Sequence, residues 1–88
     1  MRIFDQEGEP VGAAVLIDDA HGLTCAHVVN DALGNPHQAQ ERPVEDILID
    51  FPLLEPGRTI AAEVVFWEPL SEAGGDIAGI RLQQPGSA

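Results

Sequence analysis

The chain has only one cysteine, Cys25, among its 88 residues. A single cysteine cannot form a disulfide within the chain, so the sequence excludes the disulfide-stabilised design of small secreted domains. Basic residues are also scarce, with four Lys and Arg against fifteen Asp and Glu and a formal net charge of -11. A field of this sign repels nucleic acid and anionic lipid, so we expect no nucleic-acid partner and no membrane partner.

Long apolar runs are missing as well. The opening residues MRIFDQEGEP carry no apolar run behind the arginine, and no segment approaches the length of a membrane span. Together with the single cysteine, this predicts a cytoplasmic protein in a reducing compartment. The composition is nevertheless 44% hydrophobic, which is enough for one globular domain with a small core.

What the chain does contain is a series of short β-rich segments separated by turn residues. Residues 28–33 followed by Gly34 indicate a single helical turn, and 35–43 and 68–75 read as loops. In the longest strand we expect one face to carry Ile60, Ala62, Val64 and Phe66. The predicted class is all-β, a small barrel or sandwich. The six predicted strands are 2–4, 11–17, 23–26, 46–51, 59–67 and 76–82.

Two residues stand out as candidates for chemistry. His27 follows a predicted strand directly, and Asp76 leads into the last one, ahead of apolar Ile77 and Ala78. A carboxylate entering a buried strand is costly unless it is hydrogen-bonded. An imidazole whose ring N–H is held by such a carboxylate has its tautomer fixed, and its other nitrogen can act as a general base. The sequence therefore predicts a contact between the two side chains.

The segments around these residues resemble a known family. GLTCAHVV (22–29) is similar to the histidine motif of trypsin-like serine peptidases, a strand ending Thr-Ala-Ala-His, and DIAGIRL (76–82) is similar to their Asp-Ile-Ala-Leu-Leu-Arg-Leu strand. The resemblance covers nearly the whole chain and implies one domain over 1–88, the first of the family's two six-stranded closed antiparallel β-barrels. It also implies that His27 is the general base and that Asp76 is its orienting carboxylate.

The departures from the family pattern are also informative. Cys25 replaces the usual first alanine, and Val28 stands where secreted relatives carry a disulfide cysteine, which places the chain nearer the disulfide-free bacterial members. The family's Gly-Asp-Ser-Gly-Gly loop is missing, and the only serines, Ser71 and Ser87, lack its glycine-rich setting. We therefore expect the N-terminal half of a serine peptidase, without its second barrel and inactive by itself.

The resemblance implies as partners a protein or peptide substrate, the remaining peptidase barrel, and sensor or scaffold domains. The alternative is a noncatalytic protein-interaction barrel derived from the same fold. A separate interpretation of the two residues is that His27 is a satisfied core histidine and Asp76 caps a turn. The sequence leaves open whether the chain is part of a longer peptidase or a natural single barrel. No cofactor is implied.

Three potential metal ligands lie close together in the sequence. His21, Cys25 and His27 alternate along one predicted strand, but three consecutive ligands on one strand face rarely converge on a tetrahedral ion, so no metal is expected. Cys25 is instead predicted to be a small buried hydrophobe. Phe66 and Trp67 are predicted to pack in the core and at the barrel rim, and Arg81 to pair with a surface carboxylate.

Overall fold

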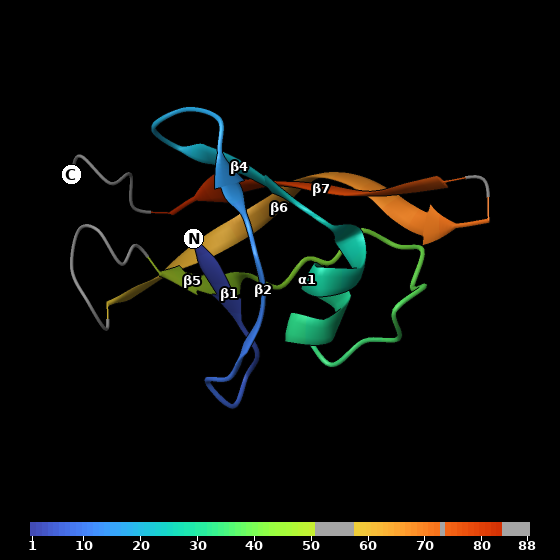
Figure 1. Ribbon diagram of the computed structural model, residues 1–88, viewed down its shortest axis with the longest axis horizontal. Helices are drawn as coiled ribbons and strands as arrows, with labels where there is room; N and C mark the ends of the chain where they lie inside the picture. The colour runs from blue at the N-terminus through green and yellow to red at the C-terminus, as the bar shows by residue number, and fades with distance from the viewer. Residues whose placement is uncertain (51–57, 73, 84–88) are drawn as a thin grey trace.

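A single antiparallel sheet of seven strands forms most of the molecule, with one helix packed against it (Figure 1). The computed structural model describes residues 1–50, 58–72 and 74–83. No helix in these ranges is long and apolar enough to cross a bilayer. The elements are β1 (Arg2–Phe4), β2 (Pro10–Ala13), β3 (Val15–Leu16), β4 (His21–Thr24), α1 (Ala26–Ala32), β5 (Ile47–Asp50), β6 (Thr59–Ser71) and β7 (Gly74–Leu82).

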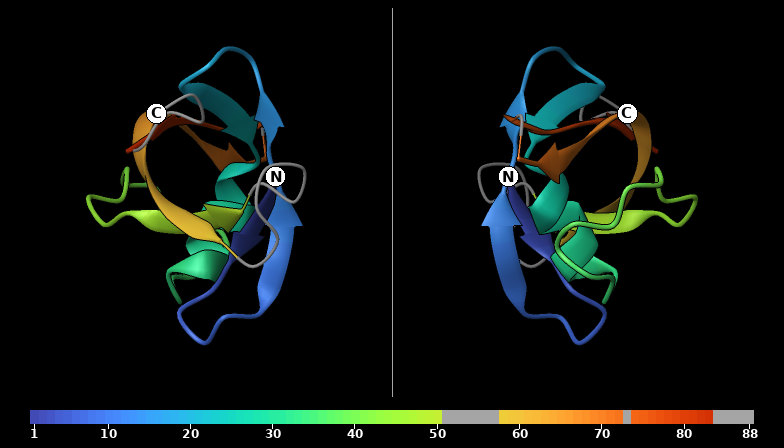
Figure 2. Two further views of the ribbon diagram at one scale, coloured as in Figure 1. Left: turned by 90° about the vertical axis from the view of Figure 1, so that its left-hand side faces the viewer. Right: turned by 90° about the vertical axis from the view of Figure 1, so that its right-hand side faces the viewer.

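The sheet curls so far that both of its edge strands belong to one continuous stretch of chain. The strand order is β2-β1-β5-β6-β7-β4-β3, so the edge strands β2 and β3 are consecutive in sequence and only Ala14 separates them. Ala14 is buried and exchanges backbone hydrogen bonds with Met1 in both directions. Because one residue links the two edges, the sheet must be nearly closed into a barrel, as the end-on views in Figure 2 show.

The predicted all-β class is confirmed, and the strand count differs by one. The segment 11–17, expected to be a single strand, is divided at Ala14 because the residues before it pair with β1 and those after it pair with β4. The predicted loop 68–75 is largely wrong, since β6 and β7 stay paired as far as Ser71 and Gly74. The strand predicted over 46–51 is observed as β5, and its last residue lies outside the described ranges.

A β-bulge in β6 overturns the predicted face of the longest strand. Ile60, Ala62 and Val64 point into the core as expected, but the register with β7 shifts between Val64 and Phe66. The extra residue reverses the alternation, so Phe66 is 49% exposed and Trp67 packs against the core instead. Trp67 therefore meets its predicted role, whereas Phe66 does not.

Helix α1 begins two residues earlier than the sequence suggested. The predicted strand 23–26 ends at Thr24, and Cys25 has extended dihedral angles at the N-cap before the first helical residue, Ala26. The predicted end is confirmed, because Gly34 has a φ of 75° and its N–H donates to the Asp31 carbonyl. Buried residues of α1 join the core from the strands; the core consists of Ile3, Ala14, Val28, Val29, Ala32, Ile47, Ile49, Ile60, Ala62, Val64, Ala78, Ile80 and Leu82.

One buried carboxylate ties β1 to β5. Asp50 is 2% exposed and accepts hydrogen bonds from the backbone N–H of Arg2 and from its guanidinium, at 2.6 to 2.9 Å. Burial by itself would raise the pKa of Asp50, but the hydrogen bonds from Arg2 outweigh it, so the pKa lies below its ordinary value. No local sequence pattern predicts this pair. Arg81, by contrast, pairs with Glu63 at the surface as predicted.

Close packing of α1 on β2 gives a first prediction. A Cβ at Gly12 would lie 2.5 Å from Cγ1 of Val28, which real side chains do not tolerate. We expect Gly12→Ala to lower the free energy of unfolding by about 1 to 3 kcal/mol in urea denaturation. In a double-mutant cycle with Val28→Ala, the two substitutions should together cost less than their sum. A Gly12→Ala variant as stable as the wild type would contradict this packing.

The Asp50 carboxylate gives a second prediction. Its pKa is lower in the folded state than in the unfolded state, so its contribution is complete above the unfolded value of about 3.9 and is lost as the pH falls through the folded pKa. The stability advantage of the wild type over Asp50→Asn should therefore be largest near neutral pH and should shrink below about pH 4. Urea unfolding across this range measures it. An advantage that is unchanged in acid would refute the assignment.

Candidate functional site

The site is built at the junction between β4 and α1. Thr24 ends the strand, and its hydroxyl donates to the Ala13 carbonyl at 2.8 Å, which fixes the end of β4 against β2. Cys25 occupies the N-cap position but makes no side-chain capping hydrogen bond. His27 follows in the first turn of the helix, so its backbone N–H has no partner within the helix. That N–H and the imidazole both need an acceptor from elsewhere.

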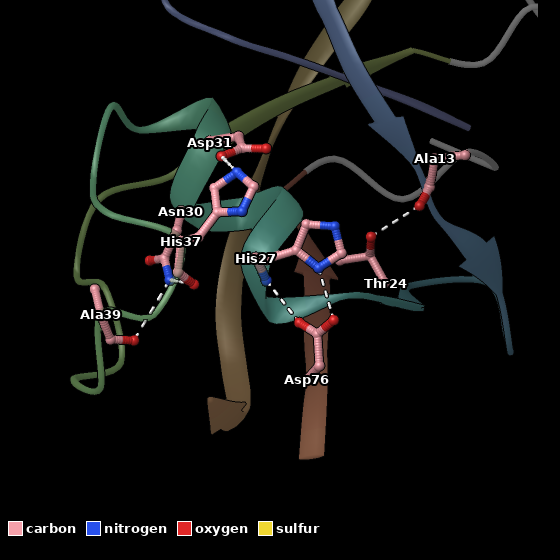
Figure 3. A network of polar contacts seen from close by, with 8 residues as sticks. All are labelled: Ala13, Thr24, His27, Asn30, Asp31, His37, Ala39 and Asp76. Atoms are coloured by element: carbon pink, nitrogen blue, oxygen red, sulfur yellow. Dashed lines mark hydrogen bonds and ion pairs between the residues drawn. The ribbon is translucent and has the colours of Figure 1, made fainter. Parts of the chain in front are cut away.

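Asp76 supplies both acceptors from β7 (Figure 3). One carboxylate oxygen, Oδ1, accepts the backbone N–H of His27 at 2.8 Å, and Oδ2 lies 2.6 Å from the imidazole Nδ1. In the sheet Thr24 pairs with Ala78, and this register places His27 beside Asp76 although 49 positions separate these two in sequence. The predicted contact between His27 and Asp76 is therefore present.

The backbone at Asp76 is in an unusual conformation. Its φ of 67° lies in the left-handed region, directly after Gly74 and Gly75, whose φ values are also positive. Aspartate enters this region more readily than most residues, but the conformation still carries strain. The strain is offset by the two hydrogen bonds that His27 donates to the carboxylate. The Gly-Gly-Asp sequence thus aims the carboxylate at the start of α1.

The carboxylate is ionised at neutral pH. Partial burial would raise the pKa of Asp76, but the hydrogen bonds from the backbone and ring of His27 outweigh it, and the pKa lies below its ordinary value. A carboxylate acceptor 2.6 Å away places the ring proton of neutral His27 on Nδ1. Nε2 then carries a lone pair, and none of the other residues drawn in Figure 3 hydrogen-bonds to it. The His27 side chain is 33% exposed, so the imidazole is partly accessible to solvent.

A second histidine lies against the first, which the sequence analysis did not anticipate. The rings of His37 and His27 have centroids 5.4 Å apart, and Nε2 of His37 lies 2.6 Å from an Asp31 carboxylate oxygen. The side-chain amide of Asn30, fully buried in α1, donates to the carbonyls of His37 and Ala39 and so holds this loop beside the helix (Figure 3). Nothing in the loop sequence signals this, because the contacts depend on how α1 packs.

The other side of the same loop is attached to β6. The indole N–H of Trp67 donates to the Gln40 carbonyl at 2.9 Å, and the Arg42 guanidinium donates to the Val64 carbonyl at 3.1 Å. Both partners on β6 flank the bulge that reverses the strand's faces. The predicted loop 35–43 is therefore held at both ends, and it covers one side of the site with a fixed surface.

Cys25 is exposed, so the prediction of a buried thiol is wrong. The prediction treated Cys25 as a strand residue pointing into the barrel, whereas the strand ends one residue earlier and the N-cap turns the side chain outward. Its Sγ and one ligand atom each from His27 and Asp76 all lie within 4.8 Å of one another. His21, the third member of the strand cluster considered from the sequence, contacts Asp18 instead.

No serine hydroxyl lies beside the imidazole in the described part of the chain. The Ser71 hydroxyl donates to the Gly74 carbonyl at 2.9 Å and belongs to the β6–β7 hairpin. Ser87 lies outside the described residues. Comparisons of the chain with protein-family models, curated proteins and solved structures gave no match. The case for a function therefore depends on the geometry at His27 and Asp76.

The two roles of Asp76 give a third prediction. In Asp76→Asn an amide NH2 group faces Nδ1–H of His27, so neutral His27 should move its proton to Nε2, and the free energy of unfolding should fall by about 1 to 2 kcal/mol. Side-chain ¹⁵N NMR identifies the tautomer, and urea denaturation gives the stability. Asp18→Asn, which changes the exposed His21 pair, is the matched control and should leave the His27 signals unchanged. An unaltered His27 tautomer in Asp76→Asn would contradict the proton assignment.

Proposed function

We propose that this chain is the N-terminal barrel of a cytoplasmic trypsin-like serine peptidase, in which His27 is the general base and Asp76 its orienting carboxylate. The observation that carries the proposal is the 2.6 Å contact between His27 Nδ1 and Asp76 Oδ2, together with the partial exposure of the His27 side chain. The nearly closed barrel and the resemblance of the segments 22–29 and 76–82 to the family's motifs support the same assignment.

The geometry suits acyl transfer in which a serine is supplied from a second barrel. As the serine oxygen attacks the carbonyl carbon of a peptide bond, Nε2 of His27 takes the serine proton, and the ionised Asp76 stabilises the imidazolium that forms. The imidazolium then gives that proton to the leaving amine, and an acyl-enzyme remains. Water hydrolyses the acyl-enzyme through the same base. Under this proposal the substrate is a protein or peptide, and the chain by itself is inactive.

A fluorophosphonate probe tests the proposal on the complete translation product of the gene. The probe reacts only with a serine activated by its base, so we expect covalent labelling of the wild type and a loss of at least about a thousandfold in labelling rate for His27→Gln. His21→Gln removes a histidine that contacts Asp18 and should label normally. Absence of labelling in the folded wild type, or labelling that His27→Gln leaves intact, would refute the proposal.

One observation favours the second candidate, a noncatalytic interaction barrel. Val15, Leu23 and Phe66 are all exposed, and the cross-strand register aligns them in a row across β3, β4, β7 and β6, with Gly79 between Leu23 and Phe66. Cross-strand partners share a face of the sheet, so these side chains form an apolar strip. Such a strip suits contact with another protein surface. A folded protein that never reacts with the fluorophosphonate, yet binds a partner through this strip, would favour the second candidate.

A further inference from the structure

Three different metal-ligating groups meet at the start of α1. Sγ of Cys25, one ring nitrogen of His27 and a carboxylate oxygen of Asp76 lie within 4.8 Å of one another. Cys25 is exposed, and the side chains of His27 and Asp76 are 33% and 20% exposed, so an ion can reach all three from solvent. The set joins residues from the N-cap and first turn of α1 with one from β7, so the fold brings these groups together without a metal.

We propose that Cys25, His27 and Asp76 bind a divalent zinc-type ion, with water as the fourth ligand. Thiolate, imidazole and carboxylate are the groups that zinc binds in proteins, at about 2.0 to 2.3 Å, which places ligand atoms of a tetrahedral site about 3.3 to 3.6 Å apart. The atoms here need to approach by about 1.5 Å at most, a shift that rotation of the exposed Cys25 side chain supplies. Nδ1 of His27 and Oδ2 of Asp76 are 2.6 Å apart, so these two atoms must instead move apart, by about 1 Å or less, to reach the tetrahedral spacing.

The charge of the site favours this class of ion. A thiolate and a carboxylate together carry two negative charges, which a divalent ion neutralises, and the chain's net charge of -11 attracts cations. A soft sulfur ligand selects zinc or cobalt over magnesium and calcium, which prefer sites made only of oxygen atoms. The expected selectivity is therefore for borderline-soft transition metals.

Binding of the ion moves two protons. The thiol of Cys25 loses its proton to solvent as the sulfur–metal bond forms. When the metal takes Nδ1 of His27, the neutral ring must carry its proton on Nε2, the nitrogen that the proposed peptidase mechanism uses as the base. This consequence, unlike the metal site itself, rests on the proposed function: the bound ion and the general base exclude each other, so zinc is a reversible inhibitor of the completed enzyme.

Cobalt substitution tests the site without any activity assay. Titration of the protein with Co²⁺ should produce a thiolate-to-cobalt charge-transfer band in the near ultraviolet and the visible bands of tetrahedral cobalt, and one equivalent of Zn²⁺ should remove them. Loss of groups that only support a metal ligand weakens binding by about 10- to 100-fold, so loss of a ligand in Cys25→Ala or Asp76→Asn should weaken Zn²⁺ binding by about a hundredfold or more. Cys25→Ala should also abolish the charge-transfer band.

The controls separate this proposal from the peptidase proposal. His21→Gln should bind Co²⁺ like the wild type, because His21 contacts Asp18 and not this site. If Asp76→Asn fails to fold by far-ultraviolet circular dichroism, Cys25→Ala alone decides the result, since Cys25 makes no capping hydrogen bond. No charge-transfer band at millimolar Co²⁺, or a band that survives in Cys25→Ala, would overturn the metal site. Failure of fluorophosphonate labelling would leave the spectroscopic result unaffected.

Discussion

The carboxylate of Asp76 satisfies the start of a helix and an imidazole at the same time. One oxygen accepts the first-turn N–H of His27 that the N-cap residue leaves without a partner, and the other orients the ring. The helix, the last strand and the ring are therefore held by one group, whose left-handed backbone conformation these hydrogen bonds stabilise. The position of the imidazole follows from the same contacts that fix α1 on the barrel.

The sequence predicted this contact because both partners lie in short segments with a clear local pattern. His27 follows a strand, Asp76 begins one, and a buried carboxylate needs a donor. Other features depend on packing that has no local signal. The bulge that exposes Phe66 inserts one residue into a strand whose alternation otherwise looks regular, and Cys25 turns outward because β4 ends one residue before it. Neither event changes the hydrophobic pattern from which strands are predicted.

The surroundings of the site were harder to predict for the same reason. His37 lies in a polar segment whose sequence predicts only a loop. Asn30 of α1 nevertheless donates to the backbone carbonyls of His37 and Ala39, and Trp67 of β6 donates to a carbonyl in the same segment. Both side chains take up these positions only in the folded barrel, because Asn30 is buried in α1 and Trp67 follows the β6 bulge. The all-β class was accessible from composition and turn spacing. The link between the two edge strands at Ala14 could not be predicted in this way, because it depends on which strands pair.

The pairing of β4 with β7 has a consequence for how the protein is made. These strands adjoin in the sheet but are distant in the chain, and such non-local pairings form slowly because the intervening chain must first lose conformational freedom. His27 and Asp76 meet only through this pairing. A nascent or misfolded chain therefore carries a histidine and an aspartate that do not interact, and their contact forms only when β4 and β7 have paired.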